Sequence, residues 1–161
     1  MDMTRKARWV IDGHKTPEQL HSTYAGVVSR ESVRIALTYA ALNDLDATCV
    51  KIRNTYLQAP PSQKDYIICG PEFGIDNMGN KALIKQALYG GKYAGRYFRN
   101  HLRSCMLHLT FQPCLDDPYD WMRPINKSNG STCYEYMLLY TDYVLVISEN
   151  DEKVLYDGIG K

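Results

Sequence analysis

Asp142 is the acidic residue whose position most suggests chemistry. It lies between two apolar runs, residues 136–140 and 143–147, which only Thr141 and Asp142 separate. Two such runs joined by two residues predict a β-hairpin with the carboxylate at its tip. A carboxylate at that place either caps the turn, which is a common use of aspartate, or faces a bound cation.

A second group of side chains could bind phosphate. Between positions 81 and 108 there are six basic residues and no acidic ones: Lys81, Lys85, Lys92, Arg96, Arg99 and Arg103. In a helix over residues 94–109 the three arginines share one side, opposite Phe98 and Leu102. Ammonium and guanidinium groups form charge-assisted hydrogen bonds with phosphate oxygens, so this face could follow a nucleic-acid backbone. A solvated helix face explains the same charges equally well.

Two helices and several strands must position these groups. Apolar residues spaced i, i+3, i+4 and i+7 predict a helix over residues 29–42, with Ser29 as its N-cap and an end at Asn43-Asp44. β-rich runs predict strands at residues 48–52, 66–69, 119–122, 133–140 and 143–147, and residues 82–88 fit either a strand or the start of a helix. This order of elements indicates an α+β fold rather than a doubly wound parallel sheet.

The composition is that of a globular protein and excludes several other classes. The chain has 161 residues, of which 45% are hydrophobic and 23% charged, and its formal net charge is +1. The longest apolar run, residues 136–148, contains Asp142 and is too short to cross a bilayer. The first residues lack the apolar core of a secretory signal, so we expect an intracellular chain, cytoplasmic or nuclear. The five cysteines lack zinc-site spacing and are expected to be reduced, mostly buried thiols.

Motifs along most of the chain resemble those of copia-type retrotransposon reverse transcriptases, in the same order. Tyr140-Thr141-Asp142-Tyr143 resembles the family's Tyr-x-Asp-Asp hairpin. The other matching segments are residues 4–10, Asp12-Gly13-His14, residues 24–46, Asn54-Thr55-Tyr56-Leu57-Gln58-Ala59-Pro60, Pro71-Glu72-Phe73-Gly74, Ala87-Leu88-Tyr89-Gly90-Gly91-Lys92 and residues 117–123. The resemblance extends to about residue 148.

The resemblance implies part of a right-hand polymerase from a Pol polyprotein. Its fold would be α+β, with fingers and an antiparallel palm sheet that has helices packed on one face. We expect residues 1–161 to form a single partial reverse transcriptase domain. Residues 1–44 would be a fingers-like opening strand and helix, and residues 45–161 palm-like with an inserted fingers segment. The thumb, RNase H and integrase regions are expected to be absent.

The family's metal site is the part that this sequence changes most. The family transfers nucleotides with two Mg²⁺ ions, which palm carboxylates hold. The resemblance aligns those carboxylate positions with Lys51, Asp142 and Tyr143, of which only Asp142 is acidic. We therefore expect Mg²⁺ not to be bound and Asp142 to be a vestigial ligand. We also expect Lys51 to pair with Asp142 across neighbouring strands, and to matter strongly for stability if the pair is buried.

The resemblance also suggests roles for residues outside the metal site. Lys6 and Arg8 would hold the triphosphate, Tyr56 would lie beneath the incoming sugar, and Lys92 would lie near the template and nucleotide. Arg96, Arg99 and Arg103 would contact nucleic acid. A core aromatic remains an equally good interpretation of Tyr56.

The expected function is a degenerate remnant of an RNA-directed DNA polymerase that has lost catalysis. In the family, the partners of this enzyme are an RNA or DNA template–primer and dNTPs. Two alternatives stay open: a non-catalytic nucleic-acid-binding module that uses the basic face over residues 81–103, and a fragment with no retained function.

Overall fold

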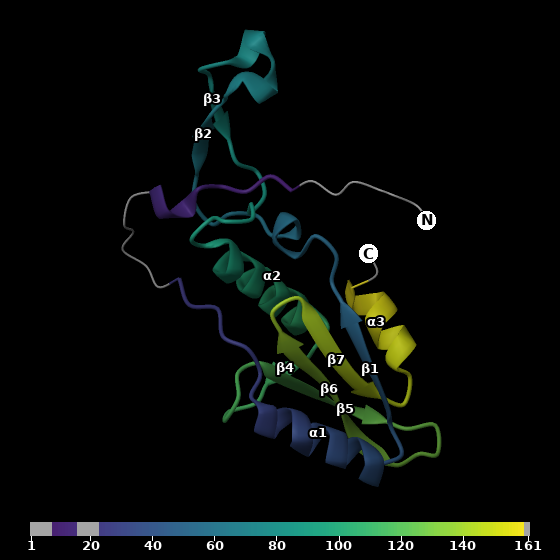
Figure 1. The fold of residues 1–161 in the computed structure, drawn as a ribbon. Helices are drawn as coiled ribbons and strands as arrows, with labels where there is room; N and C mark the ends of the chain where they lie inside the picture. Colours follow the sequence, from purple (N-terminus) through teal and green to yellow (C-terminus); the bar gives the residue numbers. More distant parts are fainter. Residues whose placement is uncertain (1–7, 16–22, 160–161) are drawn as a thin grey trace, which may run out of the picture. The chain divides into compact units, whose positions relative to one another are not determined.

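The structure, a computed structural model, describes residues 8–15 and 23–159 and is drawn as a ribbon in Figure 1. The chain divides into two compact units, which are described separately below. The first consists of Met1–Tyr24 and Asn54–His101, and the second of Ala25–Arg53 and Leu102–Lys161. Within the described part of the chain, no helix is both long and apolar enough to cross a membrane.

The second unit is built on a five-stranded antiparallel sheet. Its strand order is β1-β7-β6-β5-β4, so the first strand of the chain lies beside the last. The strands are β1 (Asp46–Lys51), β4 (Gln112–Pro113), β5 (Asp120–Asn126), β6 (Thr132–Tyr140) and β7 (Tyr143–Ser148). The α+β class and the hairpin between the last two strands are as the sequence predicted.

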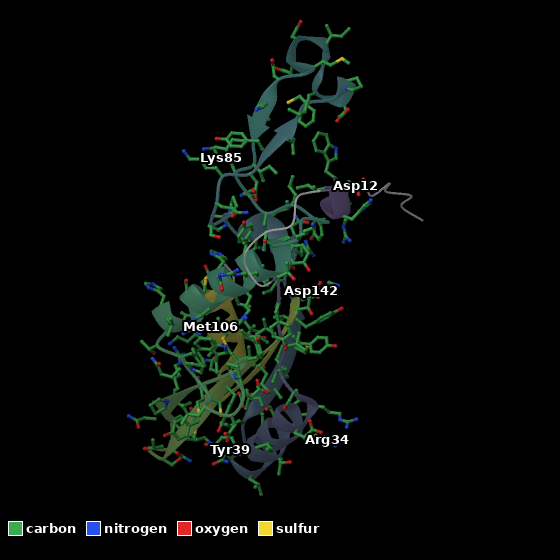
Figure 2. All side chains as sticks on the ribbon, turned by 90° about the vertical axis from the view of Figure 1, so that its left-hand side faces the viewer. Asp12, Arg34, Tyr39, Lys85, Met106 and Asp142 are labelled. Carbon is green, nitrogen blue, oxygen red and sulfur yellow. The ribbon has the colours of Figure 1, made fainter. Side chains whose placement is uncertain are left out.

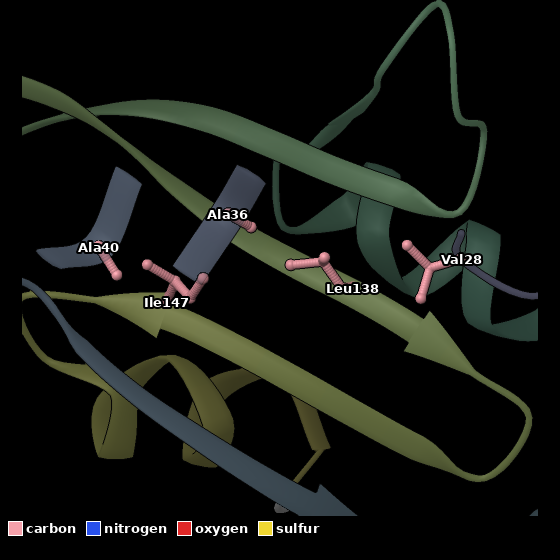
Figure 3. Packing of buried hydrophobic residues seen from close by; sticks show 5 residues of the cluster. All are labelled: Val28, Ala36, Ala40, Leu138 and Ile147. Carbon is pink, nitrogen blue, oxygen red and sulfur yellow. The ribbon is translucent and has the colours of Figure 1, made fainter. Parts of the chain in front are cut away.

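Helix α1 (Arg30–Leu42) covers one face of this sheet. It starts where predicted, because the Ser29 hydroxyl accepts a hydrogen bond from the Ser32 N–H at 3.0 Å, and it ends at Asn43. Ala36 and Ala40 are buried against Leu138 and Ile147, and Val28 joins the same cluster (Figure 3). Small alanines on the inner stripe let the helix lie close to the sheet.

The opposite face of the sheet is also covered, which corrects the expectation that helices pack on one face only. Met137 and Leu138 are neighbours in β6 and are both essentially fully buried, although consecutive strand residues point to opposite faces. A strand apolar on both faces must be covered on both. The resemblance implied one helical layer, whereas the continuous apolar run of β6 requires two.

Helices α2 (Ala94–His108) and α3 (Asp151–Ile159) reach this second face. The Arg103 guanidinium carbon of α2 lies 5.9 Å from the centre of the Trp121 ring, and Trp121 pairs with Met137. Lys153 and Val154 of α3 line a cavity with Glu135, a β6 residue on the same face as Met137. Helix α2 is within one residue of its predicted bounds, whereas α3 was not predicted.

The first unit has short elements around a small sheet. Strands β2 (Tyr66–Ile68) and β3 (Lys81–Leu83) are antiparallel, so residues 82–88 supply only the end of a strand and no helix. Short 3-10 turns occur at Gly13–Lys15, Thr55–Gln58, Pro71–Phe73 and Ile75–Asn77.

The five cysteines of the chain are all free thiols, as expected, but only Cys69 and Cys133 are buried.

Candidate functional site

The β6–β7 hairpin presents Asp142 at its tip (labelled in Figure 2). Tyr140 and Tyr143 form the last pair of the two strands, and Thr141 adopts a left-handed conformation with φ of 53°. The Asp142 carbonyl accepts a hydrogen bond of 2.8 Å from the Ile52 N–H, just beyond the end of β1. That bond brings the end of β1 up to the turn.

The three positions aligned with palm carboxylates therefore meet in one cluster. Lys51 is the register partner of Tyr143. The Lys51 Nζ lies 3.2 Å from the Asp142 Oδ2 and donates a hydrogen bond of 3.3 Å to the Tyr143 hydroxyl. It also lies 4.8 Å from the centre of the Tyr143 ring. The ion pair expected between Lys51 and Asp142 is present, and Tyr143 completes it.

This cluster lies at the surface rather than in the core. The side chain of Lys51 is 56% exposed and that of Asp142 is 28% exposed. The hydrogen bond to Tyr143, followed by the hydrogen bond and charge of Asp142, raises the pKa of the Lys51 ammonium above its ordinary value of 10.5. Lys51 is therefore charged throughout the neutral range, but water screens the pair.

The residues of this cluster do not fit Mg²⁺. Magnesium prefers several oxygen ligands in near-octahedral geometry. Here the one carboxylate already binds an ammonium, and a second cation would be repelled by Lys51. Among the described residues, no group of three or more His, Cys, Asp and Glu side chains is arranged to hold a metal ion.

Asp117, which the sequence predicted only as a turn residue, has a structural role. Its carboxylate accepts hydrogen bonds from the Ser29 N–H (2.8 Å), the Ser32 hydroxyl (2.7 Å) and the Tyr119 N–H (3.0 Å). Burial favours a higher pKa for this carboxyl, but these hydrogen bonds outweigh it and lower the pKa below 3.8. Asp117 thereby ties the loop before β5 to the first turn of α1.

Asp120 is a buried acid that sequence reasoning missed. It is 8% exposed, and its Oδ1 finds no hydrogen-bond partner among the described residues. Burial, with a smaller contribution from the Asp117 charge, raises the pKa of this carboxyl to about 6. The only sequence signal was an acid beside Trp121 and Met122 in a short predicted strand, which is too common to point to this environment.

In the first unit, two of the predicted nucleotide-binding residues surround Tyr89. The Arg8 guanidinium carbon lies 5.1 Å from the centre of the Tyr89 ring, and the Tyr56 ring lies 5.0 Å from it. The Ile11 N–H donates to the Tyr89 carbonyl at 2.7 Å. Tyr56 also contacts Phe98 edge to face, so its core-aromatic interpretation keeps support.

The glycines nearby show how closely two of the matching motifs approach each other. A Cβ atom on Gly13 would overlap the carbonyl oxygen of Gly90, which itself has a φ of +80°. Lys92, two residues further on, lines a cavity of about 200 Å³ together with Tyr93 and Tyr97. Lys6 lies outside the described residues.

The predicted nucleic-acid-binding arginines all lie on α2. Arg96 and Arg99 are half-buried and already engaged with other groups of the chain, and Arg103 lies over Trp121. The predicted site residues thus fall into two groups: Lys51, Asp142 and Tyr143 in the second unit, and Arg8, Tyr56 and Lys92 in the first. Helix α2 begins in the first unit and ends in the second.

Comparison with known proteins agrees with the motifs. The family model for reverse transcriptase (RNA-dependent DNA polymerase) matches residues 1–157. The Retrovirus-related Pol polyprotein from transposon RE1 of Arabidopsis thaliana is 28% identical over 157 residues, which is 96% of this chain and 10% of that protein. The Retrovirus-related Pol polyprotein from transposon TNT 1-94 of Nicotiana tabacum is 25% identical over 150 residues, 90% of this chain and 11% of that protein.

The chain thus spans about a tenth of the length of the curated relatives that it matches. No solved structure matches it. The family model covers nearly every residue, and the relatives are retrotransposon Pol polyproteins of the copia type that the motifs indicated. The chain therefore belongs to the reverse transcriptase (RNA-dependent DNA polymerase) family.

Proposed function

We propose that this chain is a remnant of a copia-type retrotransposon RNA-directed DNA polymerase and that it does not catalyse nucleotide transfer. The observation that carries the proposal is the 3.2 Å ion pair between Lys51 and Asp142 at the hairpin tip. In this account, the ion pair and Tyr143 occupy the positions at which the family's carboxylates hold two Mg²⁺ ions.

The chemical argument rests on charge. Two-metal catalysis needs anionic oxygens that neutralise two divalent cations and hold them a fixed distance apart. This cluster supplies one carboxylate, one ammonium and one phenol, so its net charge is zero where the chemistry needs several negative charges. The Asp142 carboxylate already forms an ion pair with the Lys51 ammonium, so its negative charge is neutralised before any metal ion binds.

In this proposal, the two units correspond to different parts of a polymerase domain. We assign the antiparallel sheet of the second unit to the palm of a partial domain, because it carries the hairpin and the strand that pairs with it. This division differs from the expected one, since α1, expected in the fingers-like residues 1–44, packs on this sheet. We assign the first unit to the fingers segment, with Arg8, Tyr56 and Lys92 as remnants of a site for dNTP and template. RNA or DNA template–primer would have been the ancestral partner.

The basic face over residues 81–103 supports a separate binding function less well. Arg96 and Arg99 are half-buried and engaged, so the helix offers fewer available charges than its sequence indicated, although Arg103, which lies over Trp121, is exposed. These contacts favour a structural role for Arg96 and Arg99, whereas Lys81 and Lys85 are exposed.

A primer-extension assay tests the proposal. The wild-type chain is incubated with an RNA template, a DNA primer, dNTPs and Mg²⁺, beside an active reverse transcriptase as positive control. We expect no extension above the level of a heat-denatured sample. Extension that the wild-type chain performs and that EDTA abolishes would contradict the proposal. Since a failure to extend the primer can have other causes, metal binding by a restored site is the stricter test.

A further inference from the structure

The turn that joins β5 to β6 contains an asparagine followed by a glycine. The turn comprises residues 127–131, and Asn129-Gly130 is the only Asn-Gly pair in the sequence. Both residues are exposed. An asparagine in such a pair can lose its side-chain amide without an enzyme, because glycine has no Cβ atom to hinder the approach of its nitrogen to that amide.

Ser131 holds the Asn129 side chain in a position that favours this reaction. The Asn129 Oδ1 accepts hydrogen bonds from the Ser131 N–H at 2.9 Å and from the Ser131 hydroxyl at 2.6 Å. The ring that the first bond closes includes the Gly130 nitrogen, so the amide is folded over that peptide. Both donors face the oxygen that becomes negatively charged when the amide carbon is attacked, and a hydrogen bond to a charged oxygen is the stronger one.

The reaction consumes one water molecule and releases ammonia. The Gly130 nitrogen loses its proton and attacks the Asn129 Cγ. A bond forms between these two atoms, the Cγ–Nδ2 bond breaks, and Nδ2 leaves as ammonia with the proton from Gly130. Water then opens the resulting cyclic imide, either at Cγ, which gives aspartate, or at the main-chain carbonyl carbon, which gives isoaspartate. The Gly130 N–H donates to the Lys127 carbonyl at 2.9 Å, so the attack requires a brief local opening of the turn.

This turn also holds two other segments of the second unit. The Lys127 Nζ donates a hydrogen bond of 2.6 Å to the Asn43 carbonyl at the end of α1. The Ser128 N–H donates to the Glu149 carboxylate at 2.9 Å, between β7 and α3, and the Ser128 hydroxyl donates to it as well. Across the turn itself, the Lys127 N–H donates to the Ser131 carbonyl at 2.7 Å. The position of both segments therefore depends on the main chain of the turn.

Isoaspartate would change that main chain, whereas aspartate would not. In isoaspartate the chain runs through the former side-chain carbon, which adds a carbon atom to the backbone between positions 129 and 130. We propose that Asn129 is a site of spontaneous deamidation that Ser131 promotes, and that its isoaspartate product releases the end of α1 and Glu149 from the turn. This inference does not depend on the proposed function.

The first test follows the reaction in the intact chain. The wild-type chain is kept at pH 8 for several days and digested, and mass spectrometry measures the loss of amide at each asparagine. Asn126 and Asn77 are internal controls, since both are exposed and a residue with a side chain follows each. We expect Asn129 to be converted faster than either, with isoaspartate and aspartate peptides that separate by chromatography.

Two serine variants test the contribution of the donors to Asn129. Ser131→Ala should slow the conversion by about threefold to tenfold, the effect of one solvent-exposed hydrogen bond. Ser128→Ala is the matched control, because Ser128 lies in the same turn but binds Glu149 instead. It should convert at the wild-type rate.

The second test compares hydrogen exchange in three forms: the unmodified wild type, the purified isoaspartate form, and Asn129→Asp. We expect the isoaspartate form to exchange at least about threefold faster in residues 127–131 and at the end of α1, because hydrogen bonds of the turn are lost. Asn129→Asp carries the same new charge on an unchanged main chain and should exchange as the unmodified wild type does.

Three outcomes would overturn the inference. They are conversion of Asn129 no faster than that of Asn126, a Ser131→Ala variant that is not slowed, and an isoaspartate form that exchanges like the unmodified chain. None of these measurements involves nucleotide transfer or Mg²⁺, so the proposed function would stand in each case.

Discussion

Lys51 and Arg123 each pair with a carboxylate, but they differ in how much water reaches them. The Lys51–Asp142 pair is exposed at the hairpin tip, whereas Arg123 binds Glu135 at 2.7 Å and the Glu135 side chain is only 7% exposed. The Arg123 guanidinium also donates to the Leu109 carbonyl at 2.7 Å and lies 4.5 Å from the centre of the Phe111 ring. Burial, rather than the presence of an ion pair, decides what each contributes to stability.

Lys51→Met is therefore expected to leave stability nearly unchanged. Arg123→Met is expected to lower the free energy of unfolding by about 3 kcal/mol, because it leaves Glu135 buried without its cation. Urea denaturation followed by circular dichroism measures both. A large loss in Lys51→Met with a negligible loss in Arg123→Met would show that the assignment of burial is reversed.

Asp120 should make stability depend on pH in an unusual direction. Its pKa is about 6 in the folded chain against about 3.8 unfolded, so between these values the folded state holds a proton that the unfolded state has released. Stability should therefore fall as pH rises from about 4 to about 6. Allowing for residual solvation, we expect a loss of about 1–2 kcal/mol.

Asp120→Asn should abolish that fall and raise the free energy of unfolding at pH 7. The exposed neighbour Asp116 supplies the control, since Asp116→Asn should keep the wild-type profile. Denaturant midpoints measured from pH 4 to pH 8 give the comparison. A wild-type profile that rises between pH 4 and pH 6 and does not change in Asp120→Asn would show that the carboxyl is not perturbed as described.

At the scale of elements, the β6–β7 hairpin contains local strain. Thr141 has a φ of 53°, a left-handed conformation that β-branched residues rarely adopt. Such strain costs about 1–3 kcal/mol. Glycine would remove the strain, but part of that gain in stability would be lost because glycine also increases the conformational freedom of the unfolded chain.

Thr141→Gly is accordingly expected to raise the free energy of unfolding by about 1 kcal/mol. Thr141→Ala keeps a Cβ atom in the same conformation and should give little or no gain. Thermal melts of the two variants and the wild type separate these effects. If alanine stabilised the chain as much as glycine, the strain would not come from the Cβ atom.

The elements that sequence predicted well are those specified locally. Helix α1 has its cap at Ser29 and its apolar stripe within a single segment, and the final hairpin has a two-residue turn between apolar runs. Helix α3 was missed because its nine residues include a glycine and because Val154, Leu155 and Tyr156 are consecutive rather than spaced as a helical stripe; of these three, Val154 is buried. Cover on both sheet faces was missed because the resemblance implied one helical layer, although the continuous apolar run of β6 requires cover on both faces.

The candidate site was predictable in its pairing but not in its surroundings. Aligning Lys51 and Asp142 with one metal site required them to be neighbours, and the register of β1 with β7 makes them so. The exposure of the pair and the buried state of Asp120 depend on how the rest of the chain covers the sheet. Such cover is a tertiary property that no short motif specifies.

At the scale of the whole molecule, the chain consists of two compact units, each of which holds some of the expected site residues. The second unit contains the cluster of Lys51, Asp142 and Tyr143, and the first contains the residues around Tyr89. We propose that the units correspond to palm and fingers of one partial polymerase domain. The proposed loss of metal binding would then be confined to the second unit, and it can be tested there without any polymerase activity.

The most direct test is titration calorimetry of Mg²⁺ into the wild-type chain and into a double variant, Lys51→Asp with Tyr143→Asp. The control double variant, Lys85→Asp with Tyr134→Asp, changes the same residue types at exposed positions away from the hairpin tip. We predict no Mg²⁺ binding by the wild type or the control, and binding by the double variant, because three carboxylates would then surround the hairpin tip. Mg²⁺ binding by the wild-type chain that Asp142→Asn removes, or a folded double variant that binds none, would contradict the account.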